Sequence, residues 1–407
     1  MPDWNALFAR RMQGVVASDI REKMKLLESH EIVHLGGGLP DPDIFPYDPL
    51  QTASEKIWGD RALARTALQY ASSEGHRPLR EWIAREMSAQ GATCSIDNIL
   101  ITNGSQQGLD FVAKLLLSPG DTAMVEIPSF IGALRAFDAY EPQYLGLPED
   151  AADWNADDLS GAKFCYVGPD FRNPTGTTMS LAERHKLLDL AGETGMAIVE
   201  DGCYEQLRYR GEDIPSLLSL AIARSGDIEK VSVLHTGTFS KTIAPSLRIG
   251  WIAGPAEVIR KLVLIKQASD LATSALNQML LLEVLDTDLD AAVARGCETY
   301  RERLDAMLAA LETNMPESVT WTRPEGGLYV WCELPPHIDG NRFAERALLE
   351  YAVSIVPGSA FYPAGARNVE TKRNTFRLSF SMISSEAARI GIERLGKLVR
   401  EWDAPAS

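Results

Sequence analysis

The middle of the chain alternates short apolar runs with segments of helical periodicity, and no other feature of the sequence constrains the fold as strongly. Runs of five or six apolar residues are typical of strands that are buried on both faces of a sheet. We expect such strands at residues 98–103, 122–127, 163–168, 196–200, 231–235 and 249–254. Because helices separate these runs, the pattern predicts an α/β fold with a mostly parallel sheet wrapped by helices.

Two of the expected helices have clear start signals. Gly104 and Ser105 directly follow the first run, and the apolar residues of 109–116 recur with a 3.6-residue period. Ser180 and Glu183 have the spacing of a capping box at the start of another helix. The first of these signals places a helix N-terminus at the end of a strand.

The chain of 407 residues is long enough for two domains. Its last part differs from the middle, because an expected helix at 291–311 is followed by strand-like segments at 326–331 and 375–381. This arrangement indicates a smaller α+β domain. We expect three parts: an N-terminal segment at 1–48 that packs with the small domain and closes the active site, a large domain at 49–288, and a small C-terminal domain at 289–407.

Charge and composition exclude several classes of protein. The chain has 40 basic and 56 acidic residues, a net charge of −16, which disfavours nucleic acid and anionic membranes as partners. No stretch is long and apolar enough to span a membrane, and the N-terminus lacks the apolar region of a secretory signal, so we expect a cytoplasmic protein. The five cysteines and six histidines show no metal-binding spacing, and we predict no metal site.

Ligands of parallel sheets bind beyond the carboxyl ends of the strands, so the residues that follow the apolar runs are candidates for a site. Ser105 and Gln106 open a helix whose free N–H groups could hold a phosphate or simply form a cap. Phe130 could stack on a planar ligand or belong to the core. Asn173 is an amide in a turn that its prolines and glycine already explain.

Later strand ends carry ionisable groups. Asp201 ends an apolar run, where a carboxylate is costly unless it pairs with a ligand cation or caps a turn. Lys241 is a candidate amine nucleophile, because burial and the nearby charge of Arg248 would lower its pKa, although a lone lysine is more often a surface residue. Arg248 together with Thr238 and Ser240 makes a plausible anion cradle.

Together, the strand ends supply a phosphate cradle, a planar stacker, a carboxylate, an amide, the phenol of Tyr204 and a lysine amine. Each signal is weak alone. The combination suits pyridoxal phosphate, which is an aromatic aldehyde with a phosphate group and a basic ring nitrogen.

An ordered set of motifs extends this interpretation: residues 20–22, 37–40, 45–46, 68–70, 74–75, 104–107, 173–176, 199–201, 204, 238–241, 326–327 and 377–380. In order and spacing they resemble the fold-type I, class I/II aminotransferases, and most closely the branch of 2-aminoadipate and kynurenine aminotransferase II. The resemblance implies a large domain with a mostly parallel seven-stranded sheet and a small α+β domain. It also implies ping-pong transfer of an amino group from an L-amino acid to a 2-oxo acid, with 2-aminoadipate- or glutamate-like, aromatic or branched-chain substrates.

The resemblance assigns roles to the candidate residues. Lys241 would attach pyridoxal phosphate through its amine and then move the proton of the substrate Cα. Asp201 would pair with the pyridine nitrogen, and Asn173 and Tyr204 would bind the ring oxygen O3′. Phe130 would stack on the ring. The phosphate ligands would be Ser105, Gln106, Thr238, Ser240 and Arg248.

Further roles concern the substrate and a second subunit. Arg377 would bind the substrate α-carboxylate beside Asn173, and Gly38 would let the N-terminal segment close over the substrate. Tyr70 would reach the phosphate of the neighbouring subunit, which implies a homodimer with shared active sites. Arg21 would read an acidic side chain or would be a solvated helix residue, and the sequence leaves both interpretations open.

The sequence departs from the family pattern at Arg172, where the branch commonly has Gln, and at Thr238, where it has Ser. The charge of Arg172, if it lies near the site, would alter substrate choice. Two other functions remain open: a lyase or decarboxylase with the same site, and an aminotransferase-like ligand sensor. The sensor is disfavoured because such proteins need an additional N-terminal DNA-binding domain, whereas the family-like motifs here begin at residue 20.

Overall fold

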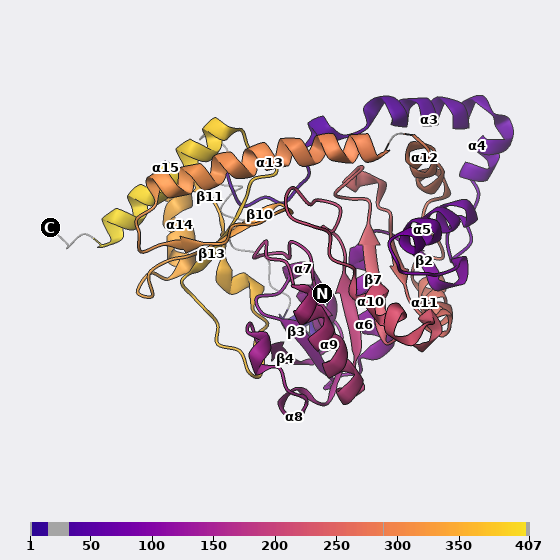
Figure 1. The fold of residues 1–407 in the computed structure, drawn as a ribbon, viewed down its shortest axis with the longest axis horizontal. Helices are drawn as coiled ribbons and strands as arrows, with labels where there is room; N and C mark the ends of the chain where they lie inside the picture. The colour runs from indigo at the N-terminus through magenta and orange to yellow at the C-terminus, as the bar shows by residue number, and fades with distance from the viewer. Residues whose placement is uncertain (1, 15–31, 288, 404–407) are drawn as a thin grey trace.

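The computed structural model describes residues 2–14, 32–287 and 289–403. Its centre is a seven-stranded sheet with the order β2-β8-β7-β6-β5-β3-β4 (Figure 1). All neighbouring strands are parallel except β8, which is antiparallel to both β2 and β7. The strands are β2 (Ile99–Thr102), β3 (Thr122–Glu126), β4 (Gln143–Leu147), β5 (Ala162–Val167), β6 (Ala197–Asp201), β7 (Val233–Thr238) and β8 (Gly250–Ala253).

The predicted α/β fold with a mostly parallel, helix-wrapped sheet is confirmed, and six of its strands lie at the six apolar runs. The sequence analysis missed β4, whose run is short and begins with the exposed Gln143. The capping box is also confirmed: the Ser180 hydroxyl accepts from the Glu183 N–H, and the Glu183 carboxylate accepts from the Ser180 N–H.

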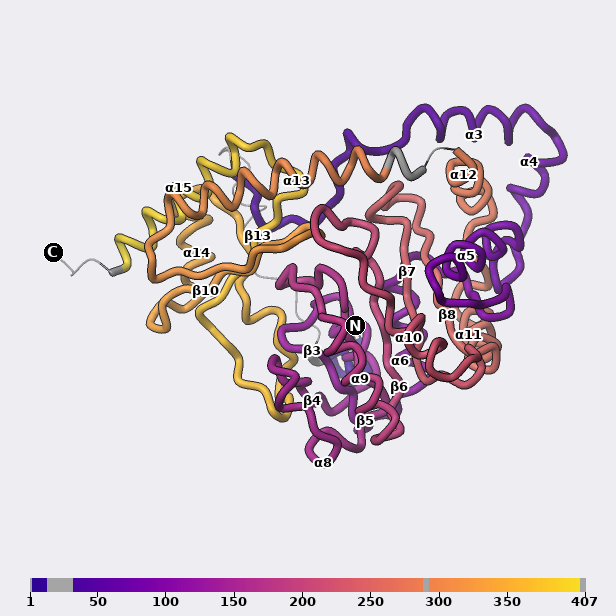
Figure 2. Tube along the Cα trace, viewed as in Figure 1, coloured from indigo at the N-terminus to yellow at the C-terminus, as the bar shows by residue number. Residues whose placement is uncertain are grey.

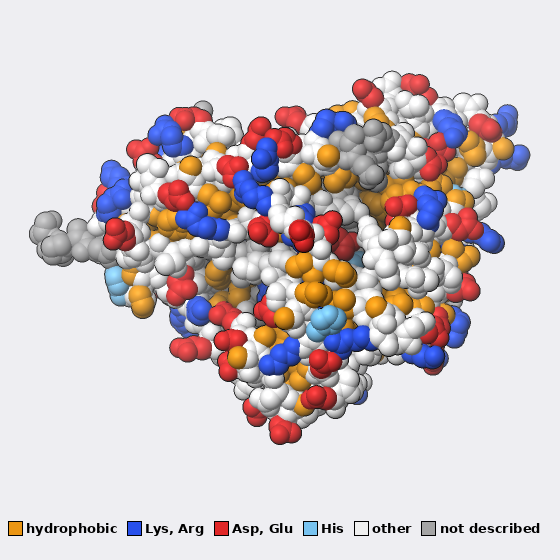
Figure 3. Space-filling view, in the orientation of Figure 1, with side chains coloured by type: hydrophobic (Ala, Val, Ile, Leu, Met, Phe, Trp, Pro, Cys, Tyr) orange, Lys and Arg blue, Asp and Glu red, His pale blue; other side chains and the backbone are white. Residues whose placement is uncertain are grey.

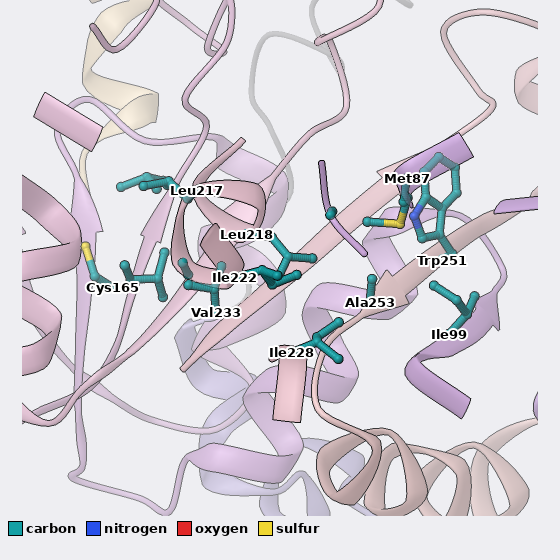
Figure 4. Close-up of a cluster of buried hydrophobic side chains, with 14 of the residues drawn as sticks. Met87, Ile99, Cys165, Leu217, Leu218, Ile222, Ile228, Val233, Trp251 and Ala253 are labelled. Atoms are coloured by element: carbon teal, nitrogen blue, oxygen red, sulfur yellow. The ribbon is translucent and has the colours of Figure 1, made fainter. Parts of the chain in front are cut away.

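Helices cover both faces of the central sheet. Because side chains alternate along a strand, each strand contributes to two hydrophobic cores. One core lies under α5 (Arg77–Ala89), α9 (Leu181–Thr194), α10 (Leu217–Ser225) and α12 (Ala275–Leu285). Part of it is drawn in Figure 4, where Leu218, Ile222 and Val233 pack together. The other core lies under α6 (Ser105–Leu116), α7 (Ile131–Asp138) and α11 (Ala256–Ser269).

A second, antiparallel sheet has the order β12-β13-β10-β9 and its own hydrophobic core. Residues 32–41 join this part of the molecule, because β1 (Val33–His34) pairs in parallel with β11 (Val353–Ser354). The remaining elements here are β9 (Thr320–Trp321), β10 (Tyr329–Glu333), β12 (Val356–Pro357), β13 (Thr375–Ser379), α13 (Leu289–Asn314), α14 (Gly340–Tyr351) and α15 (Ser385–Asp403).

An arm of two helices, α3 (Tyr47–Gly59) and α4 (Arg61–Ala67), lies at the end of the molecule furthest from α15 (Figure 2). The arm packs against α12. The described residues also contain two short helices, α1 (Trp4–Leu7) and α8 (Ala156–Leu159). None of the described helices is both long and apolar enough to cross a membrane. On the face shown in Figure 3, acidic and basic side chains are interspersed.

Candidate active site

The carboxyl ends of the central strands meet the antiparallel sheet at one place, and the candidate residues come from both sides. Asp201 is the last residue of β6, and Lys241 follows β7 in a short turn. From the antiparallel sheet come Tyr329 on β10 and Arg377 on β13. The two adjacent strands hold these side chains in a fixed register, with Tyr329 opposite Ser379.

The Lys241 amine faces the N-terminal segment. Its Nζ donates to the Gly38 carbonyl oxygen at 3.2 Å and lies 5.8 Å from the centre of the Tyr204 ring. An added Cβ on Gly38 would lie 2.1 Å from the hydroxyl oxygen of Tyr329, so only glycine fits there. The backbone of Gly38 thus lies next to the Lys241 amine.

The Asp201 carboxylate is 7% exposed and is held from two neighbouring strands. The Tyr166 hydroxyl donates to its Oδ2 at 2.8 Å, and the Thr236 hydroxyl donates to its Oδ1 at 3.4 Å. Among the described residues, no basic side chain forms an ion pair with Asp201. A buried carboxylate without a cation is costly, and a protonated ring nitrogen would supply the missing charge.

Hydroxyl and guanidinium groups gather at the N-terminus of α6. The Thr238 hydroxyl donates to the Ser240 Oγ at 3.0 Å, and Arg248 lies 3.4 Å from the same oxygen. Arg248 also donates to the Asn103 carbonyl oxygen at 3.1 Å. Gly104 precedes the helix with φ of 78° and provides no side-chain cap, so the first N–H groups of α6 stay available. This arrangement fits a phosphate group.

Phe130 and Gln106 lie side by side next to this cradle. An added Cβ on Gly132 would meet both the Phe130 ring, at 2.4 Å, and the Gln106 side-chain oxygen, at 2.6 Å. Cys203, which the sequence analysis did not single out, connects two parts of the site. Its thiol donates to the Ser105 Oγ at 3.1 Å and lies next to Asp201. Burial raises the pKa of the Cys203 thiol well above its ordinary value.

The Arg377 guanidinium is 8% exposed. It donates to the Asn173 side-chain oxygen at 2.7 Å and to the Gly36 carbonyl oxygen at 2.8 Å. Its Nε has no hydrogen-bond partner, and among the described residues no carboxylate pairs with the side chain. The rings of Tyr329 and Phe361 lie 4.2 and 5.1 Å from its Cζ. A buried, incompletely bonded arginine of this kind suits the carboxylate of a ligand.

Three candidates lie apart from this cluster or outside the described residues. Tyr70 follows the α3–α4 arm and is 82% exposed. Arg21 lies outside the described residues. Arg172 is next to Asn173 in sequence but pairs with the buried Glu126, 3.6 Å away. Burial raises the pKa of Glu126 to about 7, although Arg172 opposes that shift.

A layer of charges lies behind Asp201. The imidazole of His235 is 3.1 Å from the Glu200 carboxylate, which also accepts from the N–H groups of Leu217 and Leu218. Burial alone would lower the pKa of His235, but Glu205 and Glu200 raise it to about 9. His235 is thus held by a buried carboxylate behind the site.

Tyr166 and Tyr329 were not among the candidate site residues, because each lies inside a strand-like run. An aromatic residue in such a run is normally interpreted as part of the hydrophobic core. One feature of the sequence could have identified Tyr166 as a candidate site residue. It lies in the run next to the one that ends at Asp201, and a phenol in such a run needs a buried partner.

Comparisons with known proteins agree on one family. The model of the family described as aminotransferase class I and II matches residues 44–395. The chain is 38% identical to aromatic-amino-acid aminotransferase 1 of Thermococcus litoralis, over 98% of this chain and 95% of that protein. It is 36% identical to a 2-aminoadipate transaminase of Thermus thermophilus, over 98% and 97% of the two chains. A crystal structure of a Pyrococcus horikoshii kynurenine aminotransferase, in complex with PMP, KYN as substrates and KYA as products, has a TM-score of 0.90 with 37% identity and covers 99% of both chains.

The contact between Gly38 and Tyr329 gives a testable prediction. We expect Gly38→Ala to lower the free energy of unfolding by about 1–3 kcal/mol, because Tyr329 is enclosed by Tyr204 and Arg377 and cannot move aside. Gly37→Ala is the matched control, since an added Cβ there meets nothing within 4 Å. Denaturant titration of both variants measures the difference, and equal stability would refute the contact.

Proposed function

Because the chain belongs to the class I and II aminotransferase family and is a pyridoxal-phosphate-dependent aminotransferase, we propose that the side chains gathered around Lys241 form its active site. The observation that carries this proposal is a pair of buried charged side chains, Asp201 and Arg377, that form no ion pair with any other described residue. Asp201 suits a cationic group of a ligand and Arg377 suits an anionic one.

Pyridoxal phosphate, when bound, supplies an aldehyde carbon for the amine and an aromatic ring that accepts the electrons left when a Cα–H bond breaks. Asp201 holds the ring nitrogen protonated, and Tyr166 and Thr236 fix its carboxylate in place. Asn173 and Tyr204 bind the ring oxygen O3′, and Phe130 stacks on the ring. The phosphate ligands are Ser105, Gln106, Thr238, Ser240 and Arg248.

Lys241 performs the proton transfer. Its amine would accept the proton of the substrate Cα and deliver it to C4′ of the cofactor, the carbon that carried the aldehyde. The Gly38 carbonyl oxygen, 3.2 Å from Nζ, orients the amine within reach of the bound substrate. The net reaction moves an amino group from an L-amino acid to a 2-oxo acid.

Arg377 positions the substrate. Its guanidinium binds the α-carboxylate as a two-pronged donor, and Asn173 keeps one of its nitrogens in place. The Gly36 carbonyl oxygen accepts a hydrogen bond from the other terminal nitrogen of Arg377. The N-terminal segment and the substrate carboxylate would therefore bind the same guanidinium. We propose that residues 1–48 close the site, with a large domain at 49–288 and a small domain at 289–407. The separate hydrophobic cores of the two sheets support that division.

The substrates that we propose are aromatic amino acids and 2-aminoadipate- or glutamate-like amino acids. The names of the two relatives support both classes. Arg172 is already paired with Glu126, so Arg21 is the better candidate for reading an acidic side chain.

We further propose that the protein is a cytoplasmic homodimer. All five cysteines are free, as expected for a reducing compartment. Leu68 and Tyr70, which follow the arm, are 73% and 82% exposed, and Trp58 on α3 is 48% exposed. Large apolar side chains that cluster on the surface mark contact sites. In the dimer, Tyr70 reaches the phosphate cradle of the other subunit.

The first experiment is the absorption spectrum of the holoenzyme during titration with single L-amino acids. We expect the band of the lysine-bound cofactor to disappear and the band of its amine form to appear, fastest with aromatic and 2-aminoadipate-like substrates. Lys241→Ala should abolish both the initial band and turnover. Lys261→Ala, on the exposed side of α11, is the control and should leave both unchanged. Loss of carbon dioxide or of the side chain in place of the amine form would indicate a decarboxylase or lyase.

The shared active site can be tested by mixing two inactive variants. Lys241→Ala and Tyr70→Ala should each be impaired, since one removes the amine and the other a phosphate ligand. Random exchange of subunits should restore about a quarter of wild-type sites, because half of the dimers are mixed and each mixed dimer contains one intact site. Mixed dimers that form but recover no activity would exclude Tyr70 from the neighbouring site.

A further inference from the structure

Tyr329 lies where several parts of the proposed active site meet, next to Tyr204, Arg377 and Gly38. It is 3% exposed and projects from β10 toward the end of β6. Its hydroxyl oxygen is 3.2 Å from the hydroxyl oxygen of Tyr204. The two rings meet edge to face, with centres 5.8 Å apart and planes at 81°. The two phenols therefore form a hydrogen-bonded pair.

The position of the Tyr329 hydroxyl is fixed from several sides. The Arg377 Cζ lies 4.2 Å from the centre of the Tyr329 ring. Gly38 leaves no room for a Cβ in front of the hydroxyl. The titratable and charged groups that face Tyr329 are Tyr204, Arg377, Lys241 and Cys203. A phenol held in this way has Tyr204 as its hydrogen-bond partner among the described side chains.

We propose that Tyr329 is a positioning residue: its hydroxyl donates to the Tyr204 oxygen and thereby directs the hydroxyl of Tyr204 toward O3′ of the cofactor. The inference rests on the proposed role of Tyr204. A phenol has one proton to donate and two lone pairs that accept. When Tyr329 occupies a lone pair of the Tyr204 oxygen, the single Tyr204 proton remains for O3′.

The direction of donation follows from the proposed role of Tyr204. Its single proton goes to O3′, so the proton shared by the two phenol oxygens, which lie 3.2 Å apart, comes from Tyr329. Burial alone would raise the pKa of Tyr329, but the positive charges of Arg377 and Lys241 lower it below its ordinary value. Burial and the neighbouring Tyr329 raise the pKa of Tyr204 well above its ordinary value. Tyr329 therefore donates and Tyr204 accepts when the Tyr204 proton is bound to O3′.

Hydrogen bonds in such a chain polarise one another, so the bond from Tyr329 makes Tyr204 a stronger donor. A stronger donor at O3′ stabilises the deprotonated form of that oxygen. The lysine-bound cofactor should therefore lose its proton at a lower pH than it would without the Tyr329 hydroxyl. Tyr329 thus adjusts the acidity of the cofactor while its ring continues to pack against Arg377.

The test is a pH titration of the absorption of the holoenzyme, for the wild type and for Tyr329→Phe. We expect the midpoint of the variant to rise by about half a pH unit, because part of one hydrogen bond is lost. We expect kcat to fall about threefold with KM for the amino donor nearly unchanged, since the ring over Arg377 remains. Tyr144→Phe is the matched control. It removes a buried hydroxyl that donates to Asp138 at 2.8 Å, away from the site, and should leave the midpoint unchanged.

A double-mutant cycle with Tyr204→Phe isolates the pathway. If Tyr329 acts through Tyr204, adding Tyr329→Phe to Tyr204→Phe causes no further shift of the midpoint. An additional shift of full size in that background would overturn the proposal, as would a single Tyr329→Phe variant whose titration superimposes on that of the wild type. The wild-type titration separates this inference from the proposed function, because a wild-type band that never responds to amino acids refutes the function itself.

Discussion

The parallel alignment of β5, β6 and β7 is the constraint on which the site depends. Parallel strands end at the same edge of a sheet, so Asn173, Asp201 and Lys241 emerge together although they are far apart in sequence. Helix α6 begins at this same edge, where Ser105 contacts Cys203 and Arg248 donates to the Asn103 carbonyl oxygen. One edge of one sheet thus provides the ring, phosphate and amine partners that we propose for the cofactor.

The second constraint is the position of the antiparallel sheet. The pairing of β10 with β13 brings Tyr329 and Arg377 over the end of the central strands. The pairing of β1 with β11 brings Gly36 and Gly38 to the same place. In the proposed site, substrate recognition therefore depends on contacts between parts of the chain that belong to separate hydrophobic cores. Any movement of one sheet relative to the other would change the distance between Arg377 and Lys241.

Much of the fold could be predicted because its physical signal is local. Apolar runs bounded by turns located six of the seven central strands, and the Ser180–Glu183 capping box located the start of α9. The missed strand, β4, is stabilised by pairing along β3 and by its contact with residues 367–369, which a short sequence window does not contain. The formation of β4 therefore depends on tertiary contacts and not on a local sequence pattern.

The residues of the proposed site also fall into two groups, those that the sequence could identify and those that it could not. Residues at strand ends, such as Asp201 and Lys241, could be named from sequence because a polar group after a buried strand requires an explanation. Tyr166 and Tyr329 could not, since their hydroxyl partners come from other strands and only the fold brings them together. The pairing of Arg172 with Glu126 was also invisible, because it joins the end of β3 to a turn after β5.

The central claim is that Lys241 is the amine that attaches the cofactor, and one measurement tests it directly. Reduction of the holoenzyme with sodium borohydride makes that attachment permanent, and proteolysis followed by mass spectrometry identifies the modified peptide. The account predicts a label on Lys241. A label on Lys266, the buried lysine that is already paired with Asp270 at 3.0 Å, or on any other lysine would contradict it.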